Sequence, residues 1–459
     1  MGYSEVLCTI CGVSFNIGRV RRKDEPKSAA WDCYNAPNSY QEADVPDGFS
    51  ECGETSGCTY YSRNLDNGCY KSPWHNPEAE QDRSDPSLEH IAGPGCKYEC
   101  ACGGAYTGNE ISFEEMQGCT TFQCLVRKRN DWKPACDDEE FEQDPNFPMF
   151  LSGLHDRMPE REIGYVDAMH PMRHNMQEHS PDDVFWDDDW ERNDYSSLPF
   201  HPWCLEVYKR ASKTWFDGKN DHMVGLVNWW RHRTSKETFS GRFSSTSRSD
   251  DVGRLNDQWW NHEHGTEYAA ANPPFIPNLA KVIANATAAE PVDGNSGVFD
   301  LPADTNLSPS PGDGFAKLPA ELKLEILSSL SSEDICNLRL VSRSFRQLPL
   351  SLFRDMLATN LNFFWEASPA KDQTPYPFLA TTTAQKFVDS PPDSRNPVPV
   401  PNLLDTSNTN WYKLYYSLRR GMRNGELKGL ANRNRIWNDC QSILESIVKH
   451  WDEWQSERD

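Results

Sequence analysis

Two cysteines near the amino terminus, Cys8 and Cys11, have the spacing of a metal-binding turn. Two thiolates at this spacing supply half of a tetrahedral site, and the glycine after Cys11 lets the backbone curl so that amides can donate to sulfur. His90 and Cys96, around a Gly-Pro-Gly turn, offer a second half. We therefore predict a closed Cys3His site of Cys8, Cys11, His90 and Cys96 that holds structural zinc and leaves no coordination position for catalysis. The same residues also fit a buried thiol pair beside an unrelated histidine.

A second metal site is predicted from residues farther along the chain. Its candidate ligands are a cysteine pair from one segment and a histidine and a cysteine from another: Cys119, Cys124, His201 and Cys204. Pro202 suits the first position of a helix, so that His201 and Cys204, three residues apart, can face one ion. The apolar residues of this helix keep helical spacing: Leu205, Tyr208, Ala211 and Trp215.

The cysteine pair of this second set is less regular than the histidine-cysteine pair. Cys119 and Cys124 would diverge by about 140° on a helix, so they need a turn in order to share an ion. Phe122, Cys124 and Val126 also alternate as residues of a strand do. That alternative pattern points Cys124 into a core.

Cysteine usage bears on the compartment of the protein. The chain has 15 cysteines, twelve of them before residue 137. Because disulfides rarely persist in the cytosol or nucleus, such a skew favours metal binding, and Cys100 or Cys102 could replace one of the chosen ligands. The sequence has no apolar run of about eighteen residues and no secretory signal at its start. We therefore expect a soluble protein of the cytoplasm, the nucleus or both, with no membrane partner.

The motifs of common enzyme classes are missing from the sequence. It has no Gly-rich phosphate loop and no G-x-S-x-G, and His262 and His264 lack the four-residue spacing of a metalloprotease helix. We therefore expect a non-catalytic protein. The formal charge of −23 disfavours nucleic acid as a partner. One basic cluster favours such a contact, and it consists of Arg19, Arg21, Arg22 and Lys23.

Residues 318–348 predict three short helices with more apolar surface than one side can bury. Pro319 suits a first helical position, and Glu321 places negative charge near the positive end of the helix dipole. Ser331 and Asp334 make a capping-box-like start for the second helix. The apolar residues of the first helix cover an arc of roughly 200°: Leu322, Leu324, Ile326, Leu327 and Leu330. So short a unit cannot offset its own ordering entropy, and it must dock on the rest of the chain, on a partner, or on both.

The same stretch resembles an F-box. The matching positions are Leu318-Pro319, Glu321-Leu322, Glu325-Ile326, Leu330, Asp334-Ile335 and Leu338-Arg339-Leu340-Val341-Ser342-Arg343 with Phe345. The resemblance implies docking onto a Skp-family adaptor and, through it, onto the cullin and RING subunits of a ubiquitin ligase. The docking residues that we predict are Leu318, Pro319, Leu322, Ile326, Leu330, Ile335, Leu338 and Val341. An ordinary three-helix piece of internal core is the alternative.

A second resemblance extends over most of the chain. It rests on C-x-I-C-G-V-x-F-N-I from Cys8, E-H-I-A-G-P-G-C from Glu89, G-C-x-T-x-Q-C-L-V from Gly118 and P-F-H-P-x-C from Pro199. These blocks are similar to blocks in a group of filamentous-fungal F-box proteins. The resemblance implies architecture rather than a particular substrate.

The organisation that we predict is a mixed α+β fold in four parts. A Cys/His-rich, zinc-binding and substrate-recognition region with irregular structure spans 1–285, followed by a flexible linker over 286–314, the F-box over 315–352 and a mainly helical region over 353–459. The linker is rich in Ala, Pro, Asp, Gly and Ser and has little periodicity. Two amphipathic helices, one from Trp411 and one from Ile436, are expected to pack on each other and on the F-box.

Taken together, these patterns predict an F-box substrate-recognition subunit of an SCF-type (Skp-cullin-RING) ubiquitin ligase, which presents a substrate protein for ubiquitination. The alternative is a zinc-containing regulatory protein that binds the Skp-family adaptor outside a ligase or contacts nucleic acid.

Overall fold

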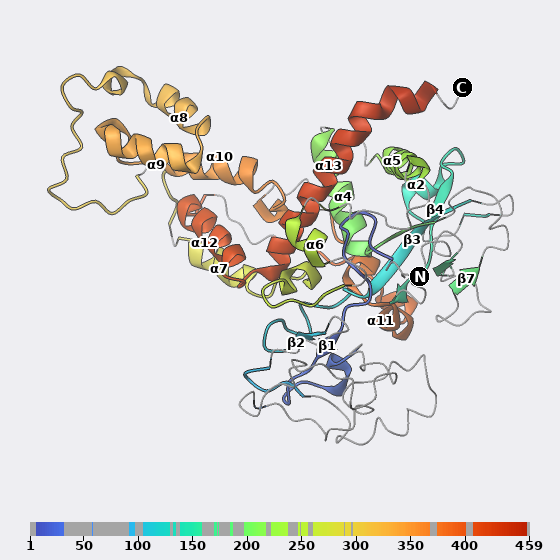
Figure 1. The fold of residues 1–459 in the computed structure, drawn as a ribbon. Helices are drawn as coiled ribbons and strands as arrows, with labels where there is room; N and C mark the ends of the chain where they lie inside the picture. The colour runs from blue at the N-terminus through green and yellow to red at the C-terminus, as the bar shows by residue number, and fades with distance from the viewer. Residues whose placement is uncertain are drawn as a thin grey trace. The chain divides into compact units, whose positions relative to one another are not determined.

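The chain divides into two compact units (Figure 1). The first comprises Met1–Ile276, Tyr376–Val398 and Ala431–Asp459, and the second comprises Pro277–Pro375 and Pro399–Leu430. The predicted mixed α+β class is confirmed by strands in the first unit and helices in both. The computed structural model describes residues 6–31, 57, 91–96, 104–128, 132–134, 138–157, 169–171, 173, 184–186, 197–216, 222–236, 247, 249–255, 260–288, 290–294, 297–367, 374–400 and 407–456.

A four-stranded antiparallel sheet lies in the first unit, and its central strand is β3 (Thr121–Arg127). Its first six residues are all buried, so both faces of the strand are covered. Cys124 pairs with Pro199 of β8, and Leu125 pairs with Leu151 of β4. The strands that pair with β3 are β4 (Met149–Leu151), β5 (His155–Asp156) and β8 (Ser197–Phe200). Strand β8 of this sheet leads directly into the helix that follows it in the sequence.

Smaller strand pairs and several helices complete the first unit. The parallel pair is β1 (Arg19–Val20) with β2 (Tyr106–Thr107), and the antiparallel pair is β6 (Met169–Pro171) with β7 (Val184–Trp186). The helices are α2 (Glu140–Gln143), α4 (Pro202–Trp215), α5 (Met223–Lys236), α6 (Asp250–Leu255) and α11 (Ala384–Asp389), with short 3-10 turns between them. As predicted, α4 begins at Pro202.

The long last helix, α13 (Lys428–Ser456), belongs to the first unit from Ala431 onward. Asn432 donates to the carbonyl of Ala271, and Arg433 donates to that of Pro273. From Ala431 onward, α13 buries polar side chains whose partners lie in the first unit. Packing of this helix on α12 and on the F-box stays a prediction. Among the described helices, α13 included, none is long and apolar enough to cross a membrane.

The second unit is helical. Its helices are α7 (Leu279–Ala286), α8 (Ala320–Ser328), α9 (Ser332–Val341), α10 (Leu350–Asn360) and α12 (Trp411–Arg423). Helix α12 contacts α10 and α7, and α10 also contacts α8 (Figure 1). The predicted cap of α9 is present, because the Ser331 hydroxyl accepts from the amide of Asp334 at 3.1 Å. Pro319 is the N-cap residue of α8 rather than its first helical residue.

Described residues from the stretch 286–314 make specific contacts within the second unit. Thr287 forms an antiparallel bridge with Thr409. The amide of Gln347 donates to the carbonyl of Phe299 at 2.6 Å, and its oxygen accepts from the Phe299 amide at 3.1 Å. The guanidinium of Arg339 lies 3.6 Å from the centre of the Phe299 ring. These contacts join Thr287 and Phe299 to the second unit, and the flexible linker over 286–314 stays a prediction.

Candidate metal centre and candidate docking surface

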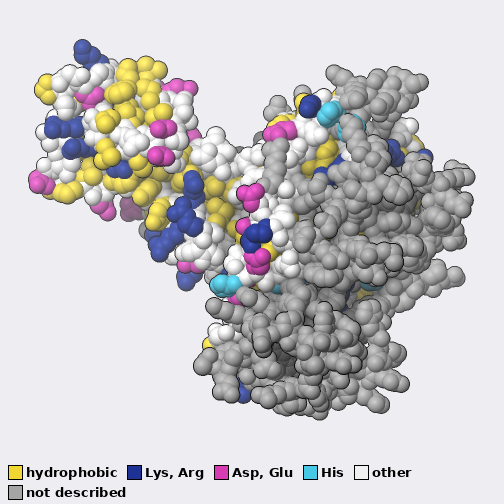
Figure 2. Space-filling view, viewed as in Figure 1, with side chains coloured by type: hydrophobic (Ala, Val, Ile, Leu, Met, Phe, Trp, Pro, Cys, Tyr) yellow, Lys and Arg dark blue, Asp and Glu magenta, His cyan; other side chains and the backbone are white. Residues whose placement is uncertain are grey.

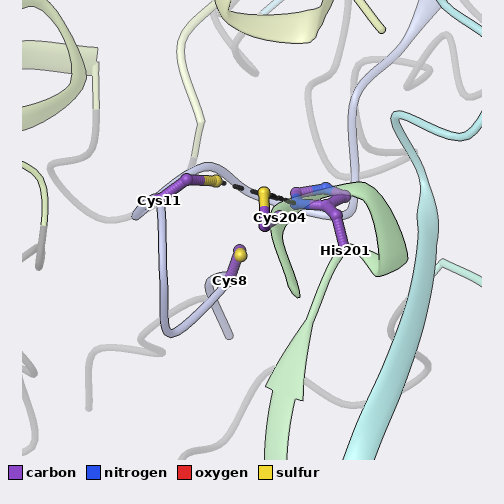
Figure 3. Close-up of side chains that lie close together, drawn as sticks. All are labelled: Cys8, Cys11, His201 and Cys204. Carbon is purple, nitrogen blue, oxygen red and sulfur yellow. Dashed lines mark hydrogen bonds between the residues drawn. The ribbon is translucent and has the colours of Figure 1, made fainter. Parts of the chain in front are cut away.

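Three thiols and one imidazole converge in the first unit (Figure 3). The sulfurs of Cys8, Cys11 and Cys204 and a ring nitrogen of His201 all lie within 4.8 Å of one another. The Nδ1 atom of His201 is 3.7 Å from the Cys11 sulfur and 3.9 Å from the Cys204 sulfur. A tetrahedral zinc ion with ordinary bond lengths separates sulfur and nitrogen ligands by about 3.6 Å. The four side chains are at most 1 % exposed, so this buried group could bind a metal such as zinc.

Cys8 and Cys11 are presented by a tight turn, residues 8–12, that we call the cysteine turn. The amide of Gly12 donates to the carbonyl of Cys8 at 2.8 Å, and Gly12 has a φ of 70°, which favours glycine. Thr9 fixes the turn to β8, because its amide donates to the carbonyl of Pro199 at 2.9 Å and its hydroxyl to the same atom at 2.6 Å. The curl of the backbone that was expected at this glycine is therefore seen in the turn.

His201 and Cys204 are positioned by the junction between β8 and α4. His201 caps the helix, Pro202 opens it, and Cys204 lies in its first turn. The Nε2 atom of His201 is 3.0 Å from the carbonyl oxygen of Cys119, which can only accept, so Nε2 carries the proton and Nδ1 is free to bind a metal. The ring of Phe15 packs against the imidazole with the ring centres 4.5 Å apart. These contacts hold the ring with Nδ1 toward the sulfurs.

The three thiols differ in acidity. Burial is the main cause that raises the pKa of Cys8, and burial likewise raises the pKa of Cys204. Burial opposes ionisation of Cys11 too, but hydrogen bonds from Cys204, Cys8 and His201 outweigh it and hold the pKa of Cys11 well below its ordinary value. Zinc binds cysteine as the thiolate, so metal binding at this group would release the protons of its thiols.

An arginine and an aspartate of α13 adjoin this group, and sequence reasoning missed them. The Nη1 atom of Arg435 donates to the carbonyl of Cys11 at 2.7 Å and lies 3.2 Å from a carboxylate oxygen of Asp439. Both side chains are buried. The signal that could have found them is an oppositely charged pair four residues apart on the helix, close to the apolar residues Ile436 and Cys440.

The ligand halves combine differently from the two predicted sets. Cys8 and Cys11 meet His201 and Cys204, because Thr9 ties the cysteine turn to β8. Cys96, Cys119 and Cys124 are buried, but their thiols do not belong to the group, and His90 lies outside the described residues. Cys124 lies on the central strand of the sheet, in accord with the core alternative. The backbone carbonyl of Cys119, rather than its thiol, contacts the group, because it accepts a hydrogen bond from His201.

Two of the four residues in the basic cluster near the amino terminus, Arg19 and Arg21, are buried. Arg19 is fully buried, pairs with the Glu25 carboxylate at 2.6 Å and donates to the carbonyl of Ala29. Arg21 is also buried, and it donates to the backbone carbonyl of Glu25. Arg22 pairs with Asp24. The guanidinium groups of Arg19 and Arg21 thus serve the fold, whereas Lys23 is exposed.

The docking surface, which we define as the exposed apolar residues of α8 and α9, lies in the second unit (Figure 2). Leu322 is 52 % exposed, Leu340 84 % and Val341 80 %. Leu322 and Val341 are among the predicted docking residues, whereas Leu340 is not. Of the other six predicted residues, Pro319 is exposed, Ile335 is buried, and four are partly exposed: Leu318, Ile326, Leu330 and Leu338. The buried side chains of this region include Leu327, Phe345 and Leu348. Apolar residues of these helices are thus divided between a core and a solvent-facing side.

A family comparison covers this part of the chain. The F-box-like family model matches residues 315–357, which span α8, α9 and the first residues of α10. No curated protein and no solved structure matches the chain. Residues 315–357 therefore form an F-box-like domain.

Proposed function

We propose that the chain is the substrate-recognition subunit of an SCF-type ubiquitin ligase, with the F-box-like domain docked on a Skp-family adaptor and, through it, on cullin and RING subunits. The observation that carries the proposal is that the matched segment, 315–357, presents Leu340 and Val341 almost fully to solvent. Exposed apolar residues grouped on neighbouring helices are typical of a protein interface. F-box domains are typical of non-catalytic adaptors, so the transfer chemistry belongs to other subunits.

The docking residues differ in burial, and we therefore propose different contributions to adaptor binding. Leu322, Leu340 and Val341 face solvent, and full burial of one such side chain by a partner contributes about 1.5–3 kcal/mol. Ile335 is buried within the chain, so its contribution to docking is to support the helices from inside. Residues Leu318, Pro319, Ile326, Leu330 and Leu338 complete the surface that we propose for the adaptor.

Co-purification with the Skp-family adaptor tests this function. The double variant Leu340→Asp with Val341→Asp should lose the adaptor, because two charges would have to enter an apolar interface. Val448→Asp is the matched control, since Val448 of α13 is 53 % exposed but lies outside the F-box-like domain. Adaptor and cullin should co-purify with the wild type and with the control. Failure of the wild type to retain the adaptor would refute the proposal.

We further propose that Cys8, Cys11, His201 and Cys204 hold a structural zinc ion. The support is a closed set of four buried donors, together with the hydrogen bond from Nε2 of His201 to the carbonyl of Cys119. Zinc would join the cysteine turn to the start of α4, and for comparable sites the free energy of metal binding is on the order of 10 kcal/mol. We propose that the first unit, stabilised in this way, recognises the substrate protein.

Metal analysis of the purified chain tests the zinc proposal. One equivalent of zinc is expected at this centre, and Cys204→Ser should lose it because serine is a poor zinc ligand. Cys124→Ser provides the matched control, since Cys124 is equally buried but its thiol lies outside the group. Equal zinc loss in the two variants, or a wild-type chain without zinc, would exclude this centre.

A further inference from the structure

Arg435 is a buried cation that reaches the cysteine turn from the far end of the sequence. Its Nη1 atom donates to the carbonyl of Cys11 at 2.7 Å, and its side chain is 6 % exposed. Burying a charged group costs free energy unless charged or polar partners compensate it. Charged or polar partners near the thiol cluster must therefore compensate the cost of burying Arg435.

The guanidinium is fixed in its orientation. Its Nε and Nη2 atoms donate to the side-chain oxygen of Asn432 at 3.1 and 2.7 Å, and Nη1 lies 3.2 Å from a carboxylate oxygen of Asp439. Asp439 is held in turn by the hydroxyl of Ser247, which is 3.1 and 3.0 Å from the two carboxylate oxygens. These contacts orient the Nη1 atom of Arg435 so that it donates to the carbonyl of Cys11.

The charge of a zinc-loaded centre complements this guanidinium. Three thiolates and one divalent ion sum to −3 + 2 = −1, since neutral histidine adds nothing. This charge lies among side chains that are at most 1 % exposed, where water screens it little. Burial lowers the pKa of Arg435, but the negative charges of Cys11, Asp439 and Cys204 outweigh it and raise the pKa of the guanidinium. Asp439 offsets part of the arginine charge, but its main contact orients Nη1.

We propose that Arg435 is a positioning residue of the metal centre, which holds the cysteine turn by the Cys11 carbonyl and offsets the negative charge of the zinc-bound thiolates. Helix α13 is then part of the metal centre as well as of the core. This inference deepens the zinc assignment proposed above and rests on it. It does not depend on the docking of the F-box-like domain.

Cobalt binding by the full-length chain, freed of zinc, tests the role of Arg435. Cobalt(II) bound by thiolates gives charge-transfer absorption that reports the occupied site directly. Arg435→Met removes the charge and the donor, so the apparent cobalt affinity should fall by about 10–100-fold, as for other outer-shell partners of metal ligands. Arg435→Lys keeps the charge and should recover part of this loss.

Arg433→Met is the matched control. Arg433 lies on the same helix and is also fully buried, but it donates to the carbonyl of Pro273 rather than to the cysteine turn. Its variant should bind cobalt within about twofold of the wild type. An equal loss of affinity in Arg433→Met and Arg435→Met would show a general packing effect and overturn the inference, as would an unchanged affinity in Arg435→Met.

Circular dichroism separates loss of affinity from loss of folding. If Arg435→Met does not fold, Arg435→Gln tests the charge role instead, because glutamine lacks the charge but retains an amide donor. Wild-type cobalt affinity in Arg435→Gln would overturn the charge role of Arg435. A weakened cobalt affinity would support it. A wild-type chain that binds no cobalt at thiolates would remove the metal centre itself, and with it this inference. Retained wild-type binding with unaffected variants would remove only the role of Arg435.

Discussion

The Nε2 atom of His201 lies 3.0 Å from the backbone oxygen of Cys119, and this contact directs Nδ1 toward the thiols. His201→Ala removes a ligand, so the metal affinity should fall by more than the roughly 100-fold expected for loss of an outer-shell partner. Cys119→Ser leaves the backbone oxygen in place and should bind metal as the wild type does. Competition against a chromophoric chelator measures both. Loss of metal in Cys119→Ser would mean that its thiol is a ligand.

Removal of zinc should destabilise one unit and spare the other. The four proposed ligands all lie in the first unit, and a metal that binds only the folded state stabilises that unit by mass action. In calorimetry, a strong chelator should lower the melting temperature of the first unit, while the second unit melts at the same temperature. Restoring zinc should restore the first transition. A chelator that leaves both transitions unchanged would contradict a structural role for the metal.

Asp313 should contribute a pH dependence to the second unit. The hydroxyl of Ser342 donates to its carboxylate at 2.8 Å, that of Ser344 at 2.9 Å and the amide of Phe315 at 3.1 Å. These hydrogen bonds, that of Ser342 first, lower the pKa of Asp313. Because the folded pKa is depressed, the stabilisation is complete above the unfolded value of 3.8 and is lost as pH falls through the folded pKa.

The comparison of wild type with Asp313→Asn isolates this contribution. The variant should melt at a lower temperature than the wild type at pH 6, and the difference should shrink as the pH is lowered below about 4. Calorimetry of the second transition measures it. A difference that stays constant down to pH 2 would mean that the ionised carboxylate does not stabilise the unit.

Alanine substitutions of Leu327 and of Leu322 in α8 should differ in their effects on stability and on adaptor binding. Leu327 is buried, so Leu327→Ala should cost about 2–5 kcal/mol in the free energy of unfolding of the second unit. Leu322 is 52 % exposed, so Leu322→Ala should change that free energy by about 0.5 kcal/mol or less while weakening adaptor binding. Denaturant titration and adaptor pull-down measure the two properties. The same effect of both variants on stability would show that Leu322 belongs to the core.

Local features of the fold could be predicted where a few neighbouring residues determine them. Ser331 caps α9, Pro202 opens α4, and Gly12 closes the cysteine turn at positive φ. Each depends on a side-chain hydrogen bond or a backbone preference within about four residues. The helices of the F-box-like domain are of this kind, and the exposure of Leu322 on α8 accords with an arc too wide for one core. Leu340 and Val341 lie on α9, for which no such arc was predicted.

The pairing of the ligand halves could not be predicted in this way. Cys11 and His201 are 190 positions apart, and spacing within each half carries no information about its partner. The link that decides the pairing is the contact of Thr9 with the carbonyl of Pro199, which leaves no pattern in the sequence. The same holds for Arg435, whose contact with Cys11 spans 424 positions.

The contact between Arg435 and the carbonyl of Cys11 also has a consequence for biosynthesis. The first unit draws on both ends of the chain, while the second lies between its segments. During translation the second unit can therefore finish folding while the first still waits for α13 to leave the ribosome. A product that stops before Arg435 would keep the residues of the F-box-like domain but lack the helix that holds the cysteine turn by the Cys11 carbonyl, so it could not assemble the first unit.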